Sequence, residues 1–370
     1  MSAISEKVRI RADITAMQAY TPTSSLEVFA EELGFLVGEL IKLDANENPY
    51  GPSPYAINAL NNLRDTISIY PDPQSSKLRK LLSDYVGVSA NNILVGAGAD
   101  ELLELIMQLF IEPGDTIINC PPTFGMYGFN APLFHANVIN VPRKSDFSLD
   151  VEGIEKAARE NDVKLLFLCS PNNPDGSMIP QETINRLLDL PLVVVLDEAY
   201  IEFSGIDGMA KRVPKISNLI VLRTFSKWAG LAGLRVGYGI FPGDLMPHLW
   251  KIKQPYNVNV AADAAARASL TDWPFLQANI KRIIAERERL GTKLGKLSFL
   301  IPYPTHSNFV LCQIEGMPAL ELKTQLAQKG ILIRYFNKPG LTDHIRISVG
   351  TPAQTDILLI ALQEIGEDYD

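Results

Sequence analysis

The segment LIVLRTFSKWAGLAGLR, residues 219–235, decides how this chain is interpreted. Its first five residues form a mostly apolar run that predicts a buried strand, and a lysine and a glycine-rich stretch follow. Most lysines are solvated surface residues, but Lys227 lies directly beyond this strand. An amine in that setting can form a Schiff base with an aldehyde. Thr224, Ser226 and Arg235 are suited to holding a phosphate group.

Two polar residues upstream occupy similar positions. Asp197 closes the apolar run 193–196, and Asn172 follows the apolar run 164–169. A carboxylate at the end of a buried strand needs a partner, which can be a cofactor or the backbone of the next turn. Taken with Lys227, these residues predict pyridoxal 5'-phosphate as cofactor, with the lysine on its aldehyde carbon and the aspartate on its pyridinium nitrogen.

Three further residues are candidates for contacts with the cofactor ring. Asn172 and Tyr200 can donate hydrogen bonds to the phenolic oxygen, although the composition around Asn172 is also that of an ordinary turn. Phe124 can stack on the ring or pack in the core, which is the commoner fate of a phenylalanine. The sequence alone does not decide between a cofactor contact and a turn for Asn172, or between a cofactor contact and core packing for Phe124.

The loop GAGADE, residues 96–101, connects a predicted strand to a helical pattern. Backbone N–H groups at a helix N-terminus bind anions, so Ala99 and Asp100 are predicted to donate to a single phosphate. A tight turn is the alternative. Glu101 stands where a dinucleotide fingerprint has its third glycine, which argues against a nucleotide-dependent dehydrogenase.

Short apolar runs alternate with helical patterns from about residue 93 to residue 240. This alternation predicts an α/β fold with a mostly parallel sheet flanked by helices. Ligands of such sheets bind beyond the carboxyl ends of the strands, where Asn172, Asp197 and Lys227 are expected. The predicted strands are 93–95, 116–119, 164–169, 192–197, 219–223 and 236–241.

The chain length of 370 residues favours one large domain and a smaller one. We expect an N-terminal arm at 1–45 that packs with the small domain, a large cofactor-binding domain at 46–260 and a small α/β domain at 261–370. Predicted elements of the small domain are helices at 261–270, 275–296, 318–329 and from 352 onward, and strands at 308–313, 331–335 and 344–349.

Composition excludes several classes of function. The net charge of −8, from 34 basic and 42 acidic residues, argues against a general nucleic-acid or anionic-membrane binder. No stretch approaches the roughly 18 apolar residues of a membrane helix, and residues 1–17 lack a signal-peptide core. The three cysteines show no metal-ligand spacing and predict a reducing, cytoplasmic location without a metal.

Two arginines lie in apolar strand patterns near the C-terminus. Arg334 follows an apolar run at 331–333, and Arg346 alternates with isoleucines in the segment 345–349. Either residue can be an outward-facing, solvated side chain. Alternatively, each can bind an anion through its planar, bidentate guanidinium.

Seven segments together resemble the fold-type I pyridoxal-phosphate-dependent aminotransferases of class II, and most narrowly the histidinol-phosphate aminotransferase family. They span most of the chain, and the lysine segment with the preceding aspartate and asparagine is the most specific part. The segments are 44–49 (DANENP), 70–72 (YPD), 96–101 (GAGADE), 170–174 (SPNNP), 197–200 (DEAY), 224–235 (TFSKWAGLAGLR) and 345–351 (IRISVGT).

The resemblance implies a homodimer with an active site shared between subunits, in which Tyr70 reaches the phosphate of the partner's cofactor. It implies transamination between L-histidinol phosphate and 2-oxoglutarate, giving imidazole-acetol phosphate and L-glutamate in histidine biosynthesis. Lys227, Asp197 and Tyr200 would be catalytic, with Lys227 as general base. Substrate contacts would come from Tyr20, Asn48, Arg334 and Arg346, with the two arginines binding the anionic ends of both substrates.

The chain departs from the family pattern at Asp175, where threonine is usual; we expect this aspartate to affect a turn and none of the predicted contacts. The same motifs occur in aromatic amino-acid aminotransferases and threonine-phosphate decarboxylases, so those activities are alternatives. A non-catalytic binding or regulatory protein on the same fold is an alternative of a different class. Such a protein would not need Lys227, Asp197, Asn172 and Arg235 together.

Overall fold

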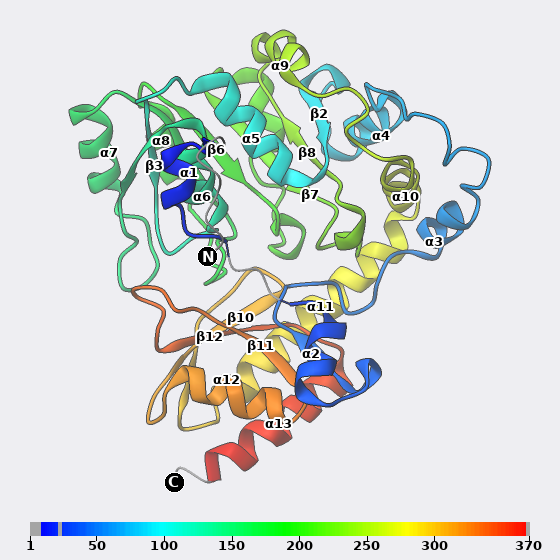
Figure 1. Ribbon diagram of the computed structural model, residues 1–370, viewed down its shortest axis with the longest axis vertical. Coiled ribbons are helices and arrows are strands. Elements are labelled where there is room, and N and C mark those ends of the chain that lie inside the picture. Colours follow the sequence, from blue (N-terminus) through cyan, green and yellow to red (C-terminus); the bar gives the residue numbers. More distant parts are fainter. Residues whose placement is uncertain (1–8, 21–23, 368–370) are drawn as a thin grey trace.

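A seven-stranded sheet forms the larger part of the computed structural model, which describes residues 9–20 and 24–367 (Figure 1). Its strand order is β2-β8-β7-β6-β5-β3-β4. Neighbours from β7 to β4 run parallel, whereas β8 is antiparallel to both β2 and β7. The predicted mostly parallel sheet is therefore confirmed. The bounds are β2 Ile93–Gly96, β3 Thr116–Asn119, β4 Asn137–Asn140, β5 Val163–Cys169, β6 Val193–Asp197, β7 Leu219–Thr224 and β8 Gly237–Ile240.

Helices cover both faces of this sheet, because alternate residues of its central strands point in opposite directions. In β5, Leu165 and Phe167 pack in the apolar cluster that includes α5 and α9, whereas Leu166 and Leu168 pack in the cluster that includes α4, α7 and α8. The helices of this part are α3 Pro54–Asn61, α4 Ser76–Val86, α5 Gly98–Phe110, α6 Met126–Asn130, α7 Val151–Glu160, α8 Gln181–Leu188, α9 Met246–Ile252 and α10 Val260–Thr271.

A second sheet of five strands, in the order β1-β11-β12-β10-β9, lies at the other end of the molecule (Figure 1). Strand β1 comes from the N-terminal segment and pairs in parallel with β11, with Ile41 opposite Ile331. The bounds are β1 Ile41–Leu43, β9 Leu300–Pro302, β10 Phe309–Ile314, β11 Ile331–Tyr335, β12 His344–Ser348, and for the helices α2 Leu26–Leu33, α11 Trp273–Leu294, α12 Ala319–Gln328 and α13 Pro352–Glu367. Helix α1, Ala12–Ala16, lies on the larger part, beside α6 (Figure 1).

The N-terminal segment contacts both parts of the molecule. Beyond the pairing of β1, the Arg11 guanidinium donates to the Leu133 carbonyl at 3.3 Å. Residues 1–8 and 21–23 of the predicted arm lie outside the described residues. Within the described part, none of the helices combines the length and apolar character needed to cross a membrane.

Candidate active site

Lys227 lies three residues beyond the end of β7, where the polypeptide leaves the sheet. Its Nζ donates to the Ala45 carbonyl at 3.1 Å and lies 5.7 Å from the centre of the Tyr200 ring. Burial, with a smaller contribution from the Arg346 charge, lowers the pKa of Lys227 to about 8. A substantial fraction of this amine is therefore neutral near physiological pH, which a nucleophile or general base requires.

Asp197 ends β6, the strand next to β7, and its side chain is buried. Its Oδ2 accepts from the Tyr127 hydroxyl at 2.7 Å, and its Oδ1 accepts from the Ala199 N–H at 3.0 Å. The alternative that Asp197 binds the backbone of the next turn is thus correct for its Oδ1. Neither donor is charged, and burial raises the pKa of this carboxyl to about 6. A cation such as a protonated pyridine nitrogen would compensate this buried carboxylate.

The amide of Asn172 is fully buried and bonded on both sides. Its Oδ1 accepts from the Thr123 hydroxyl at 2.8 Å, and its Nδ2 donates to the Pro122 carbonyl at 3.1 Å and to the Asp175 carboxylate. The expectation that Asp175 touches none of the predicted contacts is therefore wrong. The tight turn 172–177 folds this carboxylate back onto the asparagine, as the Gly176 N–H bond to the Asn172 carbonyl shows.

Tyr200 is held by a residue of the segment that follows β1. Its hydroxyl accepts from Asn46 Nδ2 at 3.1 Å, and Asn46 Oδ1 accepts in turn from the Ser348 hydroxyl at 3.0 Å. Burial raises the pKa of Tyr200 well above its usual value, so the hydroxyl stays protonated and can donate a hydrogen bond. Sequence analysis missed Asn46 and Tyr127, because nothing in their local pattern shows which distant side chain each one meets.

The predicted phosphate-binding residues meet where α5 begins. The Thr224 hydroxyl donates to the Ser226 hydroxyl at 3.0 Å, and Arg235 lies against Gly98, where an added Cβ would be 2.8 Å from its Nη2. Ala99 and Asp100 occupy the first turn of α5, as the predicted backbone donors require. In addition, the Asp100 carboxylate pairs with Arg235 at 2.8 Å, so a bound phosphate would compete with it for this guanidinium.

Arg346 and Arg334 lie opposite each other on β12 and β11. Arg346 is 6% exposed, so its interpretation as a solvated residue is wrong; Arg334 is only partly buried. Arg346 donates to Asn173 Oδ1 at 2.5 Å and to the Asp44 carbonyl at 2.8 Å. Its Nε is a buried donor without a hydrogen-bond partner among the described residues. Burial lowers the pKa of Arg346 to about 10.

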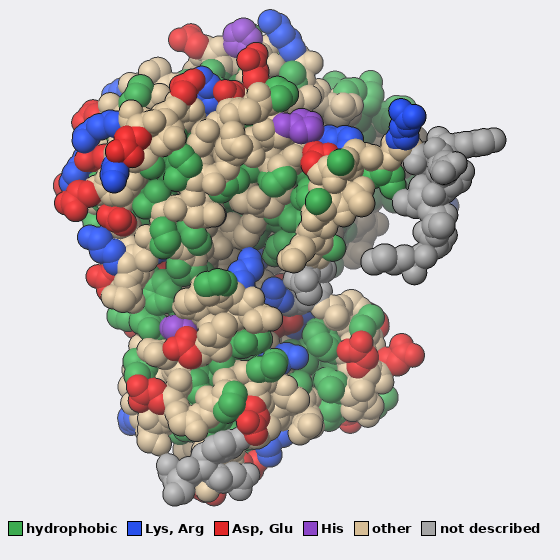
Figure 2. Space-filling view, turned by 60° about the vertical axis from the view of Figure 1, so that its left-hand side comes forward, with side chains coloured by type: hydrophobic (Ala, Val, Ile, Leu, Met, Phe, Trp, Pro, Cys, Tyr) green, Lys and Arg blue, Asp and Glu red, His purple; other side chains and the backbone are tan. Residues whose placement is uncertain are grey.

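Basic side chains also gather in the hollow between the two parts of the molecule (Figure 2). The segment after β11 contributes to the contact between these parts, because a Cβ added to Gly125 would lie 3.3 Å from Lys338 Nζ and 3.6 Å from the Tyr20 ring. The Tyr20 ring also packs edge-on against Phe129 at 5.8 Å. Phe124, next to Gly125, packs edge-on against Tyr127, which places it beside the partner of Asp197.

Two predicted residues have other local roles. Asn48 donates to the Trp228 carbonyl at 2.9 Å and accepts from the Tyr50 N–H at 2.9 Å, so it connects its loop to the segment after Lys227. Tyr70 is 79% exposed and stacks on Tyr256 with 4.7 Å between ring centres. Their predicted contacts with substrate and with the partner's cofactor remain predictions.

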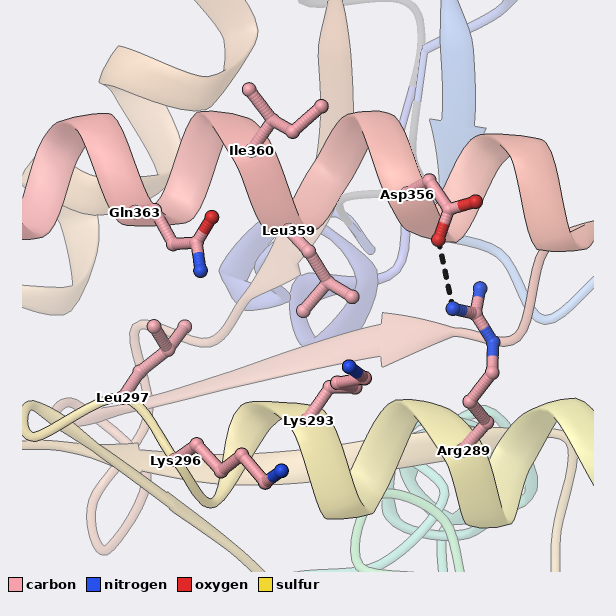
Figure 3. Close-up of a pocket in the computed structure, with 8 residues that line it drawn as sticks. All are labelled: Arg289, Lys293, Lys296, Leu297, Asp356, Leu359, Ile360 and Gln363. Atoms are coloured by element: carbon pink, nitrogen blue, oxygen red, sulfur yellow. Dashed lines mark hydrogen bonds and ion pairs between the residues drawn. The ribbon is translucent and has the colours of Figure 1, made fainter.

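A separate cavity of about 380 Å³ lies between α11 and α13, where Arg289 pairs with Asp356 at 2.8 Å (Figure 3). It is lined by Arg289, Lys293, Lys296, Leu297, Asp356, Leu359, Ile360 and Gln363. None of the predicted site residues lines this cavity, so we do not assign the active site to it.

Comparison with known proteins agrees with the geometry at the ends of β5, β6 and β7. Residues 38–362 match the family model described as aminotransferase class I and II. The chain belongs to this aminotransferase family. It is 51% identical over 363 residues to a histidinol-phosphate aminotransferase of Roseiflexus castenholzii, covering 96% of this chain and 98% of that protein. It is 49% identical to the chloroplastic histidinol-phosphate aminotransferase 1 of Arabidopsis thaliana, covering 96% of this chain and 85% of that one.

The fold of this aminotransferase also matches solved structures. A crystal structure of histidinol-phosphate aminotransferase from Sinorhizobium meliloti, in complex with pyridoxal-5'-phosphate, superposes with a TM-score of 0.90 and 29% identity, covering both chains completely. The predicted family, its fold type and its cofactor are thereby confirmed. The roles assigned to single residues remain predictions.

The residues present fit pyridoxal phosphate. Three groups suit its three reactive parts: an amine with a pKa of about 8, a buried carboxylate with only neutral donors, and an anion site at the start of α5. Lys227 would hold the aldehyde carbon, Asp197 the ring nitrogen, and Thr224, Ser226 and Arg235 the phosphate. Asn172 and Tyr200 follow the carboxyl ends of β5 and β6, and both are buried.

Proposed function

We propose that this protein is a histidinol-phosphate aminotransferase that interconverts L-histidinol phosphate and 2-oxoglutarate with imidazole-acetol phosphate and L-glutamate, in histidine biosynthesis. The observation that carries the proposal is the juxtaposition of Lys227 and Tyr200 with buried Arg346, whose charge contributes to the lowered pKa of Lys227. A reactive amine and an anion-binding guanidinium thus share one site. Relatives 45–51% identical over nearly the whole chain carry the name of this enzyme.

Each residue then has a defined task. When bound, pyridoxal phosphate supplies a carbonyl carbon that condenses with amines and a ring that accepts electrons from the substrate carbon. Lys227 Nζ takes the proton from the α-carbon of the amino donor as general base. Asp197 holds the proton on the ring nitrogen, while Tyr200 and Asn172 orient the phenolic oxygen. Burial of these groups keeps water away from the reacting atoms.

The arginine pair explains how one site accepts two substrates in turn. The amino donor ends in a phosphate and 2-oxoglutarate ends in carboxylates, and a guanidinium binds either anion in a bidentate manner. Arg346 has a buried Nε without a partner among the described residues, which suits an incoming oxygen atom. Arg334 lies directly opposite it on the neighbouring strand. Tyr20 is among the groups that act electrostatically on Arg346, which supports a role for it in the same contact.

We also propose a homodimer with shared active sites. The segment around Tyr70 exposes several large apolar side chains, among them Ile67 at 69% and Ile69 at 63% exposure. Tyr70 stacks on Tyr256, whose neighbour Asn257 donates to Glu101 in the first turn of α5 at 2.7 Å. The apolar patch is therefore connected to the rim of the predicted phosphate site, where a partner's Tyr70 could reach it across a two-fold axis.

Domain division and location complete the proposal. The boundary near residue 45 is supported by β1, which pairs with the C-terminal sheet. Helix α10 packs against α3 and α4 of the larger part, so we propose that the small domain begins near residue 272 instead of at the predicted residue 261. A cytoplasmic location is supported by the three cysteines, which are all buried and free.

The test is an absorbance titration of the purified holoenzyme with L-histidinol phosphate and no oxo acid. Conversion of the cofactor spectrum to its aminated form, followed by its restoration with 2-oxoglutarate, would show both half-reactions. A spectrum that changes only with phenylalanine would make the protein an aromatic amino-acid aminotransferase. Release of carbon dioxide from threonine phosphate would make it a decarboxylase, and no response to any amine would leave only a binding protein.

A further inference from the structure

Asp175 is a buried carboxylate at the edge of the cofactor site. It is 1% exposed and lies in the turn between β5 and α8. One oxygen accepts from the Asn172 amide, and the other accepts from the Ser177 N–H at 2.8 Å. Burying a charged group is costly unless it is well hydrogen-bonded, so these two bonds are what hold the carboxylate in place.

The contact with Asp175 fixes the direction of the Asn172 amide. An amide NH2 group has two protons, and in this structure one is directed to Asp175 and the other to the Pro122 carbonyl. The Thr123 hydroxyl occupies the amide oxygen. A hydrogen bond to a carboxylate is stronger than one to a neutral carbonyl, so the proton on the Asp175 side is the more firmly held of the two.

Other titratable groups lie on neighbouring elements. Asp197 ends β6, Tyr200 follows it, Lys227 follows β7, and Arg346 of β12 reaches Asn173. Each of these groups comes from an element other than the turn that carries Asp175. Among the hydrogen-bond partners that the described chain offers to the Asn172 side chain, Asp175 is the one charged group.

We propose that Asp175 is a positioning residue that acts through Asn172 and increases the affinity of the cofactor's phenolic oxygen for a proton. The inference rests on the proposed function, because it requires pyridoxal phosphate in this site with Asn172 facing its phenolic oxygen. Deprotonation makes that oxygen an anion, which a donated N–H stabilises and a neighbouring carboxylate destabilises. Asp175 competes with that oxygen for an N–H group of Asn172, which leaves less of this donor for the phenolic oxygen and so favours its protonated form.

The experiment compares the pH dependence of the cofactor absorbance in the wild-type holoenzyme and in Asp175→Asn, which keeps the side-chain shape and an acceptor for Asn172. Removing the charge weakens the competing bond to Asn172, frees its N–H for the phenolic oxygen, and should lower the pH midpoint of the spectral change by roughly one unit. Asp189→Asn, at the exposed end of α8, is the matched control and should leave the midpoint unchanged. A midpoint that stays within about 0.2 units of wild type in Asp175→Asn, or that rises, overturns the proposal.

A second pair of variants tests whether the effect passes through Asn172. In an Asn172→Ala background, the additional Asp175→Asn change should produce less than half of its original shift. An undiminished shift would mean that the charge acts through space, and the positioning role would be wrong. If Asp175→Asn does not fold, Asp175→Thr serves in its place, because its hydroxyl is also an acceptor.

A readout independent of turnover is the affinity of the apoenzyme for pyridoxal phosphate, measured by fluorescence titration. Asp175→Ala removes the competing acceptor and should strengthen cofactor binding several-fold at a pH where the phenolic oxygen is an anion, whereas Asp175→Asn keeps an acceptor and should change it much less. Equal affinities in both variants and wild type would contradict the positioning role. Failure of the proposed function looks different, because the wild-type protein itself would then show no cofactor spectrum or no response to histidinol phosphate.

Discussion

At the scale of single residues, burial favours the neutral forms of Lys227 and Asp197, the two groups to which we assign the central chemical roles. It lowers the pKa of Lys227 to about 8 and raises that of Asp197 to about 6. For the lysine this is directly useful, since a general base must be unprotonated. For the aspartate, the raised pKa reflects the free-energy cost of burying its negative charge, and a bound cationic ring would compensate that charge. The apoenzyme is therefore poised to react with an aldehyde and to bind a protonated pyridine.

The lowered pKa of Lys227 should be visible in its reactivity. In the apoenzyme, the rate of acylation of Lys227 by trace acetic anhydride should rise with pH and level off above about pH 9, because most of the amine is then neutral. A short lysine peptide, with an ordinary pKa, should keep gaining reactivity beyond pH 10. Peptide mass spectrometry measures both rates.

Arg346 provides the control for the cause of this shift. Arg346→Gln removes a cation that contributes to the lowered pKa, so the midpoint of Lys227 acylation should move to higher pH. Arg159→Gln, which changes an exposed arginine of α7, should leave it in place. An acylation profile of Lys227 that matches the free peptide would show that burial does not depress this pKa.

Asp197→Asn should separate stability from activity. The folded pKa of Asp197 lies above the value near 3.9 of an unfolded chain. Ionisation of this carboxyl therefore lowers the free energy of unfolding above about pH 6, and this loss is absent below pH 4. The variant apoenzyme should therefore be more stable than wild type by on the order of 2–3 kcal/mol at pH 8, and the difference should shrink as the pH falls towards 4.

Urea unfolding of both apoenzymes at pH 8 and pH 4.5 measures that difference. Transaminase activity of the reconstituted variant should fall by at least about 100-fold, since the ring nitrogen loses the carboxylate that keeps it protonated. If the variant is less stable than wild type at both pH values, the hydrogen bonds of Asp197 outweigh the cost of its burial.

The sequence was sufficient to predict that Lys227, Asp197, Asn172 and Tyr200 lie at or just beyond the carboxyl ends of parallel strands, because each ends or follows an apolar run. It was not sufficient to predict which side chains form hydrogen bonds with them. Tyr127 holds Asp197 from 70 positions away, and Asn46 holds Tyr200 from 154 positions away. No local pattern encodes such pairs, and for the same reason the contact between Asp175 and Asn172 was missed even at a separation of three residues.

At the scale of elements, the loop after Lys227 depends on one glycine. Gly230 has a φ of +68°, and a Cβ added there would lie 2.5 Å from the Gly51 carbonyl carbon. The close approach brings the loop 48–52 against the lysine loop, where Asn48 bonds to Trp228. Gly233 of the same loop has nothing within 4 Å of an added Cβ. The two glycines therefore form a natural comparison.

Gly230→Ala should destabilise the protein by at least about 1–2 kcal/mol, because alanine is strained at positive φ and its Cβ would displace the backbone at Gly51. Cofactor affinity should fall as well, since the displacement acts on the loop that carries Lys227. Gly233→Ala should change neither quantity by more than about 0.5 kcal/mol. Thermal unfolding and cofactor titration measure both, and equal effects of the two changes would contradict the packing argument.

Strands that are buried on both faces were predictable from the sequence, whereas the polar strand β4 at the edge of its sheet was not. The runs at 164–169 and 219–223 correspond to β5 and β7, which are nearly all buried. Strand β4, with the sequence NVIN, was missed because it lies at the edge of its sheet and carries asparagines at both ends. Edge strands are short and partly polar, so their sequences lack the signal that a buried strand gives.

At the scale of the whole molecule, the two-part architecture follows from composition, but the pairing that joins its ends does not. Ile41 lies opposite Ile331 across the β1–β11 pair, and this register is set by the folded sheet rather than by either segment alone. The exposed apolar side chains around Tyr70 could not be predicted either, because exposure depends on what the rest of the chain covers. Their presence on the surface is what supports a dimer.

A mixed dimer tests this arrangement. If the partner subunit supplies Tyr70 to each site, Tyr70→Ala and Lys227→Ala proteins should each be weakly active or inactive alone. Unfolding and refolding them together in equal amounts would make half of the dimers mixed, and each mixed dimer would contain one site with both residues intact. Activity should then recover to about a quarter of the wild-type value. Mixing without refolding is the control. A mixture that shows only the mean activity of its two components would place Tyr70 and Lys227 of each site in the same chain.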